Sequence, residues 1–470
     1  MSDITGWHMP PAKGDTVTVK ITDMNNLGCG VGRLGADGES GGKVVFVNGA
    51  VTGDTVEAKI IKVTSSYCVA RLESVTEPSP YRTEDICGAP LACGGCIYRN
   101  ITYDHELALK REYVYNAFRK AGLPDITVLP VLTAGKRTNY RNKAMYPVGR
   151  NSSGITAGFY ASKTHTIIPA YDCAIQNGSF KEIVKFVCSY ADEHGISVYN
   201  EKTGRGLLRH IYLRTAVATG EIMLCLVING DFLPGDRDFV RSTCGRFPDI
   251  TGILLNINKK NTNVVLGGRF VTLFGREYIE DILCGLRFRI TPQSFYQVNH
   301  DGAELLYSLA KKLAALDGSQ TVVDLYCGTG TIGLTMADSA KEVIGVEIVE
   351  SAVECAGENA RLNGIVNASF YCGDSEVPES LLAGVDKKHG NCLDGATVII
   401  DPPRKGITRE LADFLARRGA AKVIYVSCGP DTLARDAVYF RENGYTVGAV
   451  QPVDMFPGTG HVECVVLMAR

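Results

Sequence analysis

The chain has 470 residues, of which 45% are hydrophobic and 21% are charged, and its net charge is −2. This composition is typical of globular proteins and excludes disordered and fibrous chains, and the length suggests about three domains. Because the net charge is close to zero, a surface that binds nucleic acid has to be a local feature of the molecule.

The 16 cysteines indicate a reducing compartment, because residues 1–16 lack the apolar core of a signal peptide and no long apolar run could span a membrane. We therefore expect a cytoplasmic protein whose cysteines are thiols, metal ligands or catalysts rather than disulfides. Most of them, such as Cys188 and Cys225, lie in apolar runs and are expected to be inert core residues.

Three domains are expected in chain order. Short alternating segments between Gly-, Asn- and Asp-rich turns predict a small β-barrel within residues 1–77, which is either a nucleic-acid-binding module or a passive appendage. A central domain over residues 78–290 contains strand-like runs and a helix at 103–121 that ends in glycine. Over residues 291–470, strands alternate with helix-compatible sequence, which predicts a doubly wound parallel sheet.

Four short apolar segments of the third domain are the predicted parallel strands, at residues 321–326, 342–347, 396–401 and 422–427. In an open α/β sheet, ligands bind outside the carboxyl ends of the strands. The side chains that follow these segments are therefore expected to share one rim of the sheet.

A glycine-rich loop follows the first of these strands and opens a helix. It carries the G-x-G-x-x-G pattern at Gly328, Gly330 and Gly333, which lets a ligand approach the backbone closely. Glu347 closes the next strand, as suits a carboxylate that binds ribose hydroxyls. The pattern predicts an adenosine-containing ligand, and Asp324 favours S-adenosylmethionine over NAD, because an acidic loop suits a cation better than a pyrophosphate.

Two later strands end in residues that can take part in a reaction, Asp401 and Cys428. If the last strand, at 461–470, runs antiparallel to its neighbours, His461 and Glu463 face the same rim. A thiol, a carboxylate and a methyl donor suit methylation of uracil at carbon 5. A thiolate that adds to C6 makes C5 nucleophilic, and a base then removes the C5 proton.

The chain resembles the RNA uracil-C5 methyltransferases, specifically the 23S ribosomal RNA members with a TRAM domain. The shared motifs are FYQVN at 295–299, DLYCGTGTIGL at 324–334, GVE at 345–347, DPPRKG at 401–406, SCGP at 427–430 and DMFPGTGHVE at 454–463. The resemblance implies an α/β protein with a Rossmann-like S-adenosylmethionine-dependent catalytic domain, an OB-like TRAM barrel and a central α+β domain. It also implies that the helical segment 99–131 packs on the catalytic domain.

The same resemblance implies roles for individual residues. Cys428 of the SCGP motif is the expected nucleophile and Glu463 of the H-x-E motif the expected base. The family's contacts to S-adenosylmethionine fall on Gln297, Tyr326, Thr331, Glu347, Asp374 and Asp401.

A cluster of cysteines precedes the predicted helix. Cys87, Cys93 and Cys96 are spaced C-x5-C-x2-C with small residues between them, and Cys173, in a polar loop-like setting, is the candidate fourth ligand. This unequal spacing is closer to iron–sulfur usage than to the paired C-x2-C of common zinc sites, although zinc also accepts four thiolates. The resemblance implies a [4Fe–4S] cluster at these four positions.

Residues 136–150 contain five basic and no acidic residues, with Tyr140 and Tyr146 interleaved. A second basic group consists of Lys202, Arg205, Arg209 and Arg214. Cations that contact phosphates and aromatic rings that stack on bases are typical of single-stranded RNA binding, although a charged stretch can also be a solvated face. Since the target base has to be flipped out, we expect Phe295 or Tyr296 to stack beside it.

Other functions fit the residues of this chain less well. Cytosine-C5 methyltransferases typically have a second cysteine in the DPPRKG region, which this chain lacks, and amino-group methyltransferases have an aromatic residue where Arg404 stands. A non-catalytic ribosome-assembly factor would not need Cys428 and Glu463. The transfer-RNA members of the resembled family lack the cysteine cluster and the barrel, so the resemblance favours 23S ribosomal RNA, and we expect a monomer.

Overall fold

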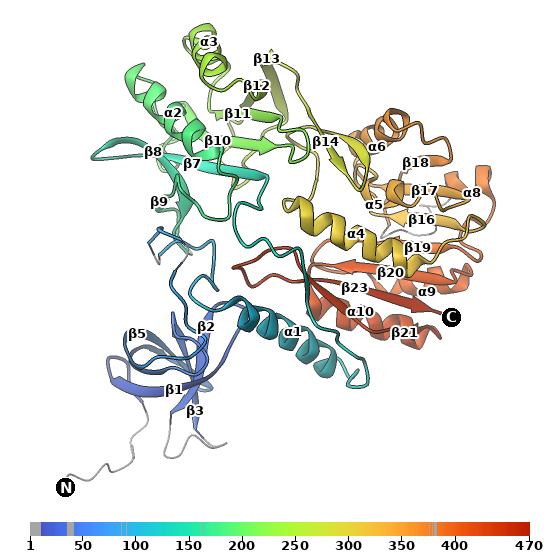
Figure 1. Ribbon diagram of the computed structural model, residues 1–470, viewed down its shortest axis with the longest axis horizontal. Coiled ribbons are helices and arrows are strands. Elements are labelled where there is room, and N and C mark those ends of the chain that lie inside the picture. The colour runs from blue at the N-terminus through green and yellow to red at the C-terminus, as the bar shows by residue number, and fades with distance from the viewer. Residues whose placement is uncertain are drawn as a thin grey trace. The chain divides into compact units, whose positions relative to one another are not determined.

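The computed structural model describes residues 11–34, 42–85, 87–90, 92–162, 164–375, 377, 379 and 383–470. Residues 1–10, part of the segment tested for a signal peptide, lie outside these ranges. The chain divides into two compact units (Figure 1). The first comprises Met1–Ile86, Cys96–Asn116 and Gly458–His461, and the second comprises Cys87–Gly95, Ala117–Pro457 and Val462–Arg470.

Five strands at the N-terminal end close into a barrel in the order β1-β2-β3-β5-β4. They are β1 (Thr16–Met24), β2 (Cys29–Leu34), β3 (Lys43–Asn48), β4 (Thr55–Val63) and β5 (Tyr67–Glu77). Alternate residues such as Val17, Val19 and Ile21 fill its interior, and their neighbours face outward. The predicted barrel is thus confirmed, although strand β2, whose two glycines weaken its pattern, was not foreseen.

The first unit also holds the beginning of α1 (Tyr103–Lys120), which confirms the helix predicted at 103–121. Glu106 on its first turns is buried and accepts hydrogen bonds from Lys110 Nζ and from the amide of Gly458, each at 2.7 Å. The carbonyl of Gly458 accepts from the amides of Ile97 and Tyr98, both at 2.9 Å. The backbone of Gly458 is therefore bound on both sides within this unit.

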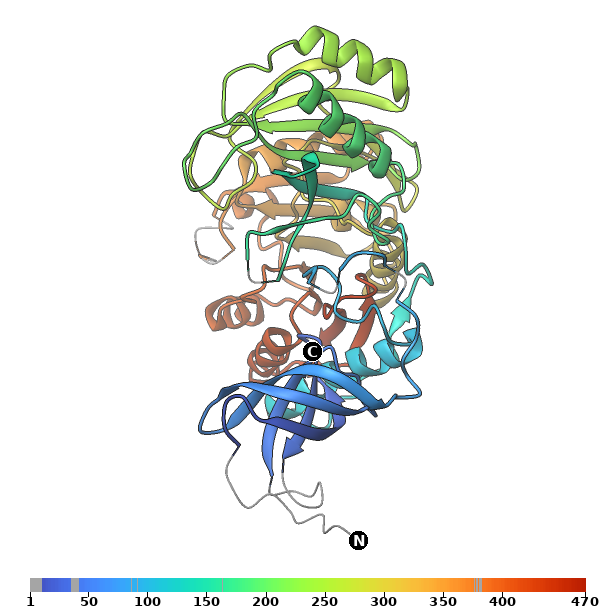
Figure 2. The ribbon, with the colours of Figure 1, turned by 90° about the vertical axis from the view of Figure 1, so that its left-hand side faces the viewer.

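A seven-stranded sheet with the order β13-β12-β11-β10-β7-β8-β9 forms one part of the second unit. Its strands are β7 (Lys143–Asn151), β8 (Gly154–Tyr160), β9 (Ile167–Pro169), β10 (Leu208–Thr215), β11 (Ile222–Ile228), β12 (Ile250–Ile257) and β13 (Arg269–Gly275). Helices α2 (Phe180–Glu193) and α3 (Asp236–Arg246) pack on one face (Figures 1 and 2). The opposite face contributes Tyr212, Met223 and Leu254 to a core shared with residues of the nine-stranded sheet.

The nine-stranded sheet of the second unit has the order β18-β17-β16-β19-β20-β23-β22-β6, and β21 pairs with β23. Its strands are β6 (Leu132–Thr133), β16 (Thr321–Leu325), β17 (Glu342–Glu347), β18 (Ala368–Cys372), β19 (Thr397–Ile400), β20 (Lys422–Ser427), β21 (Thr446–Val447), β22 (Gln451–Asp454) and β23 (Glu463–Ala469). Strands β16 to β20 are parallel, and β23 runs antiparallel to β20. All four predicted parallel strands and the antiparallel last strand are confirmed.

Helix α4 precedes the first parallel strand of this sheet, and the other helices follow its strands, as expected for a doubly wound fold. The helices are α4 (His300–Ala314), α5 (Thr331–Thr335), α6 (Glu350–Leu362), α8 (Ala383–His389), α9 (Arg409–Arg417) and α10 (Pro430–Glu442). A hairpin of β14 (Ile279–Leu283) and β15 (Leu286–Ile290) leads into α4. Among the described residues, no helix combines the length and apolar character needed to cross a membrane.

Candidate active site at the rim of the parallel sheet

The carboxyl ends of the parallel strands bring most of the predicted site residues to one rim. Tyr326 follows β16, Glu347 ends β17, Asp401 follows β19 and Cys428 follows β20. Asp401 lies within electrostatic range of Cys428, and Asp401 and Glu347 both lie within electrostatic range of Asp324 in β16. The side chains that follow these four strands therefore share one rim of the sheet, as the sequence predicted.

Two carboxylates hold the glycine-rich loop in place. Asp324 Oδ2 accepts a hydrogen bond from the amide of Gly333 at 2.9 Å, and Glu347 accepts from the amide of Gly328 at 3.1 Å. The backbone of Gly330 has φ +81°, and a Cβ there would lie 3.1–3.2 Å from neighbouring side chains, so this position requires glycine. Two carboxylates and a glycine-specific backbone therefore define the shape of this loop.

Asp324 fits a positively charged ligand. The carboxyl is buried, its Oδ1 has no hydrogen-bond partner, and burial together with Asp401 and Glu347 raises its pKa to about 8. A cation bound nearby would favour the ionised carboxylate. The carboxylates around this loop therefore suit S-adenosylmethionine, which carries a sulfonium charge and ribose hydroxyls.

The other predicted cofactor residues lie in different environments. Thr331 is buried and its hydroxyl is 3.3 Å from the hydroxyl of Tyr307, so this side chain already has a protein partner. Asp374 follows β18, directly after Gly373, whose amide donates to the carbonyl of Glu347 at 2.9 Å. Gln297 is buried in the segment before α4.

Cys428 and Glu463 are brought opposite each other by the pairing of β20 with β23. Ser427, the last residue of β20, is the partner of Cys464, so Cys428 comes opposite Glu463, and the two groups lie within electrostatic range of each other. Cys428 is half-buried, while Glu463 is only 5% exposed. A carboxyl and a thiol from distant parts of the chain are therefore adjacent at the rim.

The surroundings of both groups favour their protonated forms. Burial, and then the charge of Asp401, raises the pKa of Glu463 to about 8. Burial, and then the charges of Glu463 and Asp401, raises the pKa of Cys428. Arg404 opposes both shifts, and it is a site residue that the sequence analysis did not propose. Its place three residues after Asp401 was the available signal.

The segment that carries Phe295 and Gln297 is held by a buried arginine. Arg214 is 0% exposed and donates to the carbonyls of Ser294 at 2.8 Å, Tyr296 at 3.1 Å and Thr291 at 3.3 Å. The hydroxyl of Tyr296 donates to Asp281 at 3.1 Å. Phe295, in contrast, is 64% exposed. Of the two rings expected to stack on a flipped base, Phe295 is accessible and Tyr296 is not.

Part of the predicted RNA surface is wrong. Tyr140, Tyr146, Arg209 and Arg214 are all buried, because the chain around them forms the interior strands β7 and β10 or packs beside them. Arg209, for example, donates to the carbonyls of Asn258 and Lys260 at 2.7 and 2.8 Å. Lys136, Arg150, Lys202 and Arg205 remain exposed.

Replacing Arg214 with lysine should destabilise the protein by about 1–3 kcal/mol, because a single ammonium group cannot satisfy the carbonyls that the guanidinium now binds. Urea unfolding measures this effect. Arg205→Lys, at an exposed position, is the matched control and should leave the free energy of unfolding unchanged. Equal stability of the two variants would contradict a structural role for Arg214.

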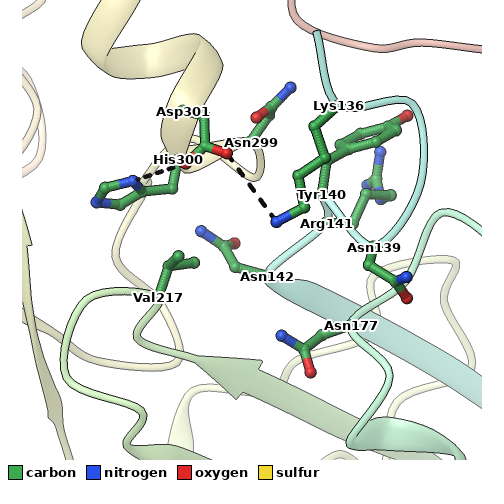
Figure 3. A pocket seen from close by; sticks show the side chains of 10 residues that line it. All are labelled: Lys136, Asn139, Tyr140, Arg141, Asn142, Asn177, Val217, Asn299, His300 and Asp301. Atoms are coloured by element: carbon green, nitrogen blue, oxygen red, sulfur yellow. Dashed lines mark hydrogen bonds and ion pairs between the residues drawn. The ribbon is translucent and has the colours of Figure 1, made fainter. Parts of the chain in front are cut away.

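A small polar pocket lies beside the segment that precedes α4 (Figure 3). Lys136 reaches toward Asp301, with Nζ and Oδ2 4.0 Å apart, and Asn299 caps α4 by accepting from the amide of Gly302. The pocket is lined by Lys136, Asn139, Tyr140, Arg141, Asn142, Asn177, Val217, Asn299, His300 and Asp301. Asn142, a buried residue of this lining, donates to the carbonyl of Gln297 at 3.0 Å.

The predicted cysteine site is divided between the two units. Cys87, Cys93 and Cys173 belong to the second unit, where Cys173 is within electrostatic range of the other two and the amides of Ile175 and Gln176 bond to its sulfur. Cys96 belongs to the first unit. Within the described ranges, no three His, Cys, Asp or Glu side chains are arranged to hold a metal ion.

Comparisons with known proteins show the family of the chain. Residues 12–72 match the TRAM domain and residues 264–470 match the tRNA (uracil-5-)-methyltransferase family. An uncharacterized RNA methyltransferase of Bacillus cereus is 39% identical over 462 residues, with 98% of each chain covered. Another, from Clostridium acetobutylicum, is 40% identical over 467 residues, again with 98% of each chain covered.

A solved structure extends the likeness to almost the whole fold. The crystal structure of Pyrococcus abyssi tRNA (uracil-54, C5)-methyltransferase in complex with S-adenosyl-L-homocysteine is similar with a TM-score of 0.76 and 26% identity, covering 96% of this chain and 100% of that chain. The fold, the glycine loop and the matches to known proteins together define an S-adenosylmethionine-dependent methyltransferase. The chain belongs to the RNA (uracil-5-)-methyltransferase family with a TRAM domain, and it methylates carbon 5 of uracil in RNA.

Proposed function

We propose that this enzyme methylates a specific uridine of 23S ribosomal RNA, with Cys428 as the nucleophile and Glu463 as the base. The observation that carries the catalytic assignment is the β20–β23 register, which sets the half-buried thiol opposite the buried carboxyl at the rim beside the glycine loop. The same rim holds Asp401 and Arg404 within electrostatic range of both groups.

The chemistry proceeds through a covalent link between Cys428 and the base. The Cys428 thiol gives its proton to solvent, its sulfur bonds to C6, and the electrons of the C5–C6 double bond move toward O4 as an enolate. S-adenosylmethionine supplies the methyl group that C5 acquires. Glu463 then takes the C5 proton, the double bond re-forms and the sulfur leaves C6.

The cofactor is held by the glycine loop and the strand ends that surround it. In this proposal Glu347, which is bonded to the loop through Gly328, also accepts from ribose hydroxyls. Asp324, with its unpartnered buried oxygen, favours the sulfonium charge. The proposed contacts are Gln297, Tyr326, Thr331, Glu347, Asp374 and Asp401, of which Thr331 would have to share its hydroxyl with Tyr307.

The RNA surface of this proposal is smaller than the sequence suggested. It consists of the exposed ring of Phe295, which stacks beside the flipped base, and of exposed cations that contact phosphates. Lys136, Lys202 and Arg205 belong to this set, and the TRAM barrel adds a second RNA-binding module.

We further propose that Cys87, Cys93, Cys96 and Cys173 bind a [4Fe–4S] cluster with a structural role. The support is their spacing and the proximity of three of them in the second unit. Protein prepared without oxygen should contain iron and sulfide in equal amounts, and Cys173→Ser should lose both. Cys188→Ser, at a buried position, is the control that keeps them. Stoichiometric zinc without sulfide would contradict the proposal.

Transfer RNA is the second candidate substrate. The Pyrococcus abyssi enzyme, which acts on uracil-54 of tRNA, covers 96% of this chain, so the presence of the barrel does not separate the two substrates. Mapping 5-methyluridine in RNA from cells that lack this protein decides between them. Loss of the modification from one position of 23S ribosomal RNA is the expected result, and loss from tRNA alone would overturn the ribosomal assignment.

A further inference from the structure

The DPPRKG segment, which begins at Asp401, forms a tight turn whose backbone is bound by helix α10. The amide of Gly406 donates to the carbonyl of Pro403 at 2.8 Å, and the amide of Ile407 donates to Asp436 Oδ2 at 2.9 Å. Arg435 Nη2 donates to the carbonyls of Lys405 at 2.8 Å and Ile407 at 3.2 Å. Adjacent side chains of α10 therefore bind the turn from both its donor and acceptor sides.

The carboxylate of this clamp is itself fixed. Asp436 is 0% exposed, its Oδ2 accepts from the hydroxyl of Tyr425 at 2.6 Å, and its Oδ1 accepts from Arg435 Nε at 2.8 Å. Gly406 has φ +75°, and a Cβ there would lie 2.3 Å from Asp436 Oδ2. The turn approaches the clamp so closely that a side chain at position 406 is excluded.

The clamped turn lies against the loop that carries the proposed nucleophile. A Cβ at Gly429 would be 3.7 Å from the carbonyl oxygen of Arg404, so the two backbones run side by side directly after Cys428. Helix α10 begins at Pro430, immediately beyond this loop. One helix thus fixes both the position of the Cys428 loop and the position of the turn that bears Arg404.

The position of Arg404 affects the ionisation of the Cys428 thiol. The charged groups that act on Cys428 are Glu463 at the start of β23, Asp401 after β19 and Arg404 of the turn. The two carboxylates oppose formation of the thiolate, and the guanidinium favours it. Arg404 is exposed, so its place beside the thiol depends on the backbone of the turn rather than on packing of its own side chain.

We propose that Asp436 and Arg435 are positioning residues that hold the 403–407 turn so that Arg404 stays beside Cys428 and Glu463. The inference rests on the proposed roles of those two residues in uracil methylation. Neither clamp residue touches substrate or cofactor in this account. Their effect on the reaction passes through the guanidinium of Arg404, which stabilises the thiolate that attacks C6.

The test measures the pKa of Cys428 directly in the full-length protein. Iodoacetamide alkylation is followed as a function of pH, with the Cys428 peptide quantified by mass spectrometry. Arg435→Lys and Asp436→Asn should each raise the pKa of Cys428 by about 1 unit, as should Arg404→Met. Below that pKa, kcat should fall about 10-fold because less thiolate is present, with little change in KM for RNA.

Glu442→Gln is the matched control, since it removes a carboxylate from the same helix whose ion-pair partner is Arg409 rather than the turn. It should titrate like the unmodified protein. Arg435 is partly exposed, so Arg435→Lys keeps the test informative if Asp436→Asn fails to fold. A folded Arg435→Lys protein with an unchanged Cys428 pKa would overturn the proposal. Alkylation does not require Cys428 to be the nucleophile, so methylation by Cys428→Ala would refute the proposed function separately.

Discussion

Replacing Cys428 with alanine should abolish methyl transfer to RNA while binding of S-adenosylmethionine is retained. Without the sulfur, no bond forms to C6 and C5 stays too weakly nucleophilic to take the methyl group. Loss of a group that acts covalently is expected to cost on the order of 10⁴-fold or more in single-turnover rate. The measurement is transfer of labelled methyl groups to RNA, with cofactor binding followed by calorimetry on the same preparation.

Cys327 of the glycine loop is the matched control for this variant. It lies at the same rim, but it is 5% exposed, and burial raises the pKa of its thiol well above the ordinary value. Cys327→Ala should therefore keep covalent chemistry. Full methyl transfer by Cys428→Ala, together with its loss in Cys327→Ala, would reverse the assignment.

Replacing Glu463 with glutamine should stall the reaction after methyl transfer. Addition of the thiolate and methylation of C5 need no carboxylate, whereas removal of the C5 proton does. A methylated RNA–protein adduct should accumulate on ordinary substrate, and turnover should fall by about 10²–10⁴-fold. Denaturing gels with labelled methyl groups detect the adduct, and Glu442→Gln, on the outside of α10, serves as the control that turns over normally.

The pH dependence gives the same prediction a second readout. The pKa of Glu463 is raised to about 8, so the fraction of the carboxylate that can take a proton increases as pH rises through that value. The rate of product release from the adduct should therefore increase between about pH 7 and 9. An adduct that lacks the transferred methyl group, or an elimination rate that is flat over this range, would contradict the role of Glu463.

The rim of the sheet could be predicted because parallel strands end at one edge. Once the glycine loop, Asp401 and Cys428 were assigned to strand ends, their proximity followed from topology alone. The antiparallel course of β23 was the additional condition that placed Glu463, and the register opposite β20 meets it. The buried state of Glu463, which raises its pKa, could not be foreseen from a strand start that might equally face solvent.

The basic stretch at 136–150 shows where sequence reasoning fails. Its charges suggested a surface, yet Ala144, Tyr146 and Val148, at alternate positions of β7, point into the core beneath α2. Whether such a strand is interior depends on its neighbours, and β7 lies between β10 and β8. The order of strands in a mixed sheet is a tertiary property that local patterns do not carry.

The clamp on the DPPRKG turn could not be predicted from the sequence for a related reason. Asp436 and Ile407 are 29 positions apart, and nothing in the helical sequence of α10 distinguishes Asp436 from its exposed acidic residues. Arg214 is a similar case, since its carbonyl partners lie 77 to 82 positions away. Residues that act through the backbone of another segment leave no motif of their own.

The most direct test of this account is to identify the cysteine that becomes bonded to RNA. Substrate RNA with 5-fluorouridine at the target position should trap the enzyme after methyl transfer, because fluorine at C5 cannot be removed as a proton. Protease and nuclease digestion followed by mass spectrometry should place the methylated fluorouridine adduct on the Cys428 peptide. An adduct on another cysteine, or methylation of uridine without any trapped species, would contradict the account.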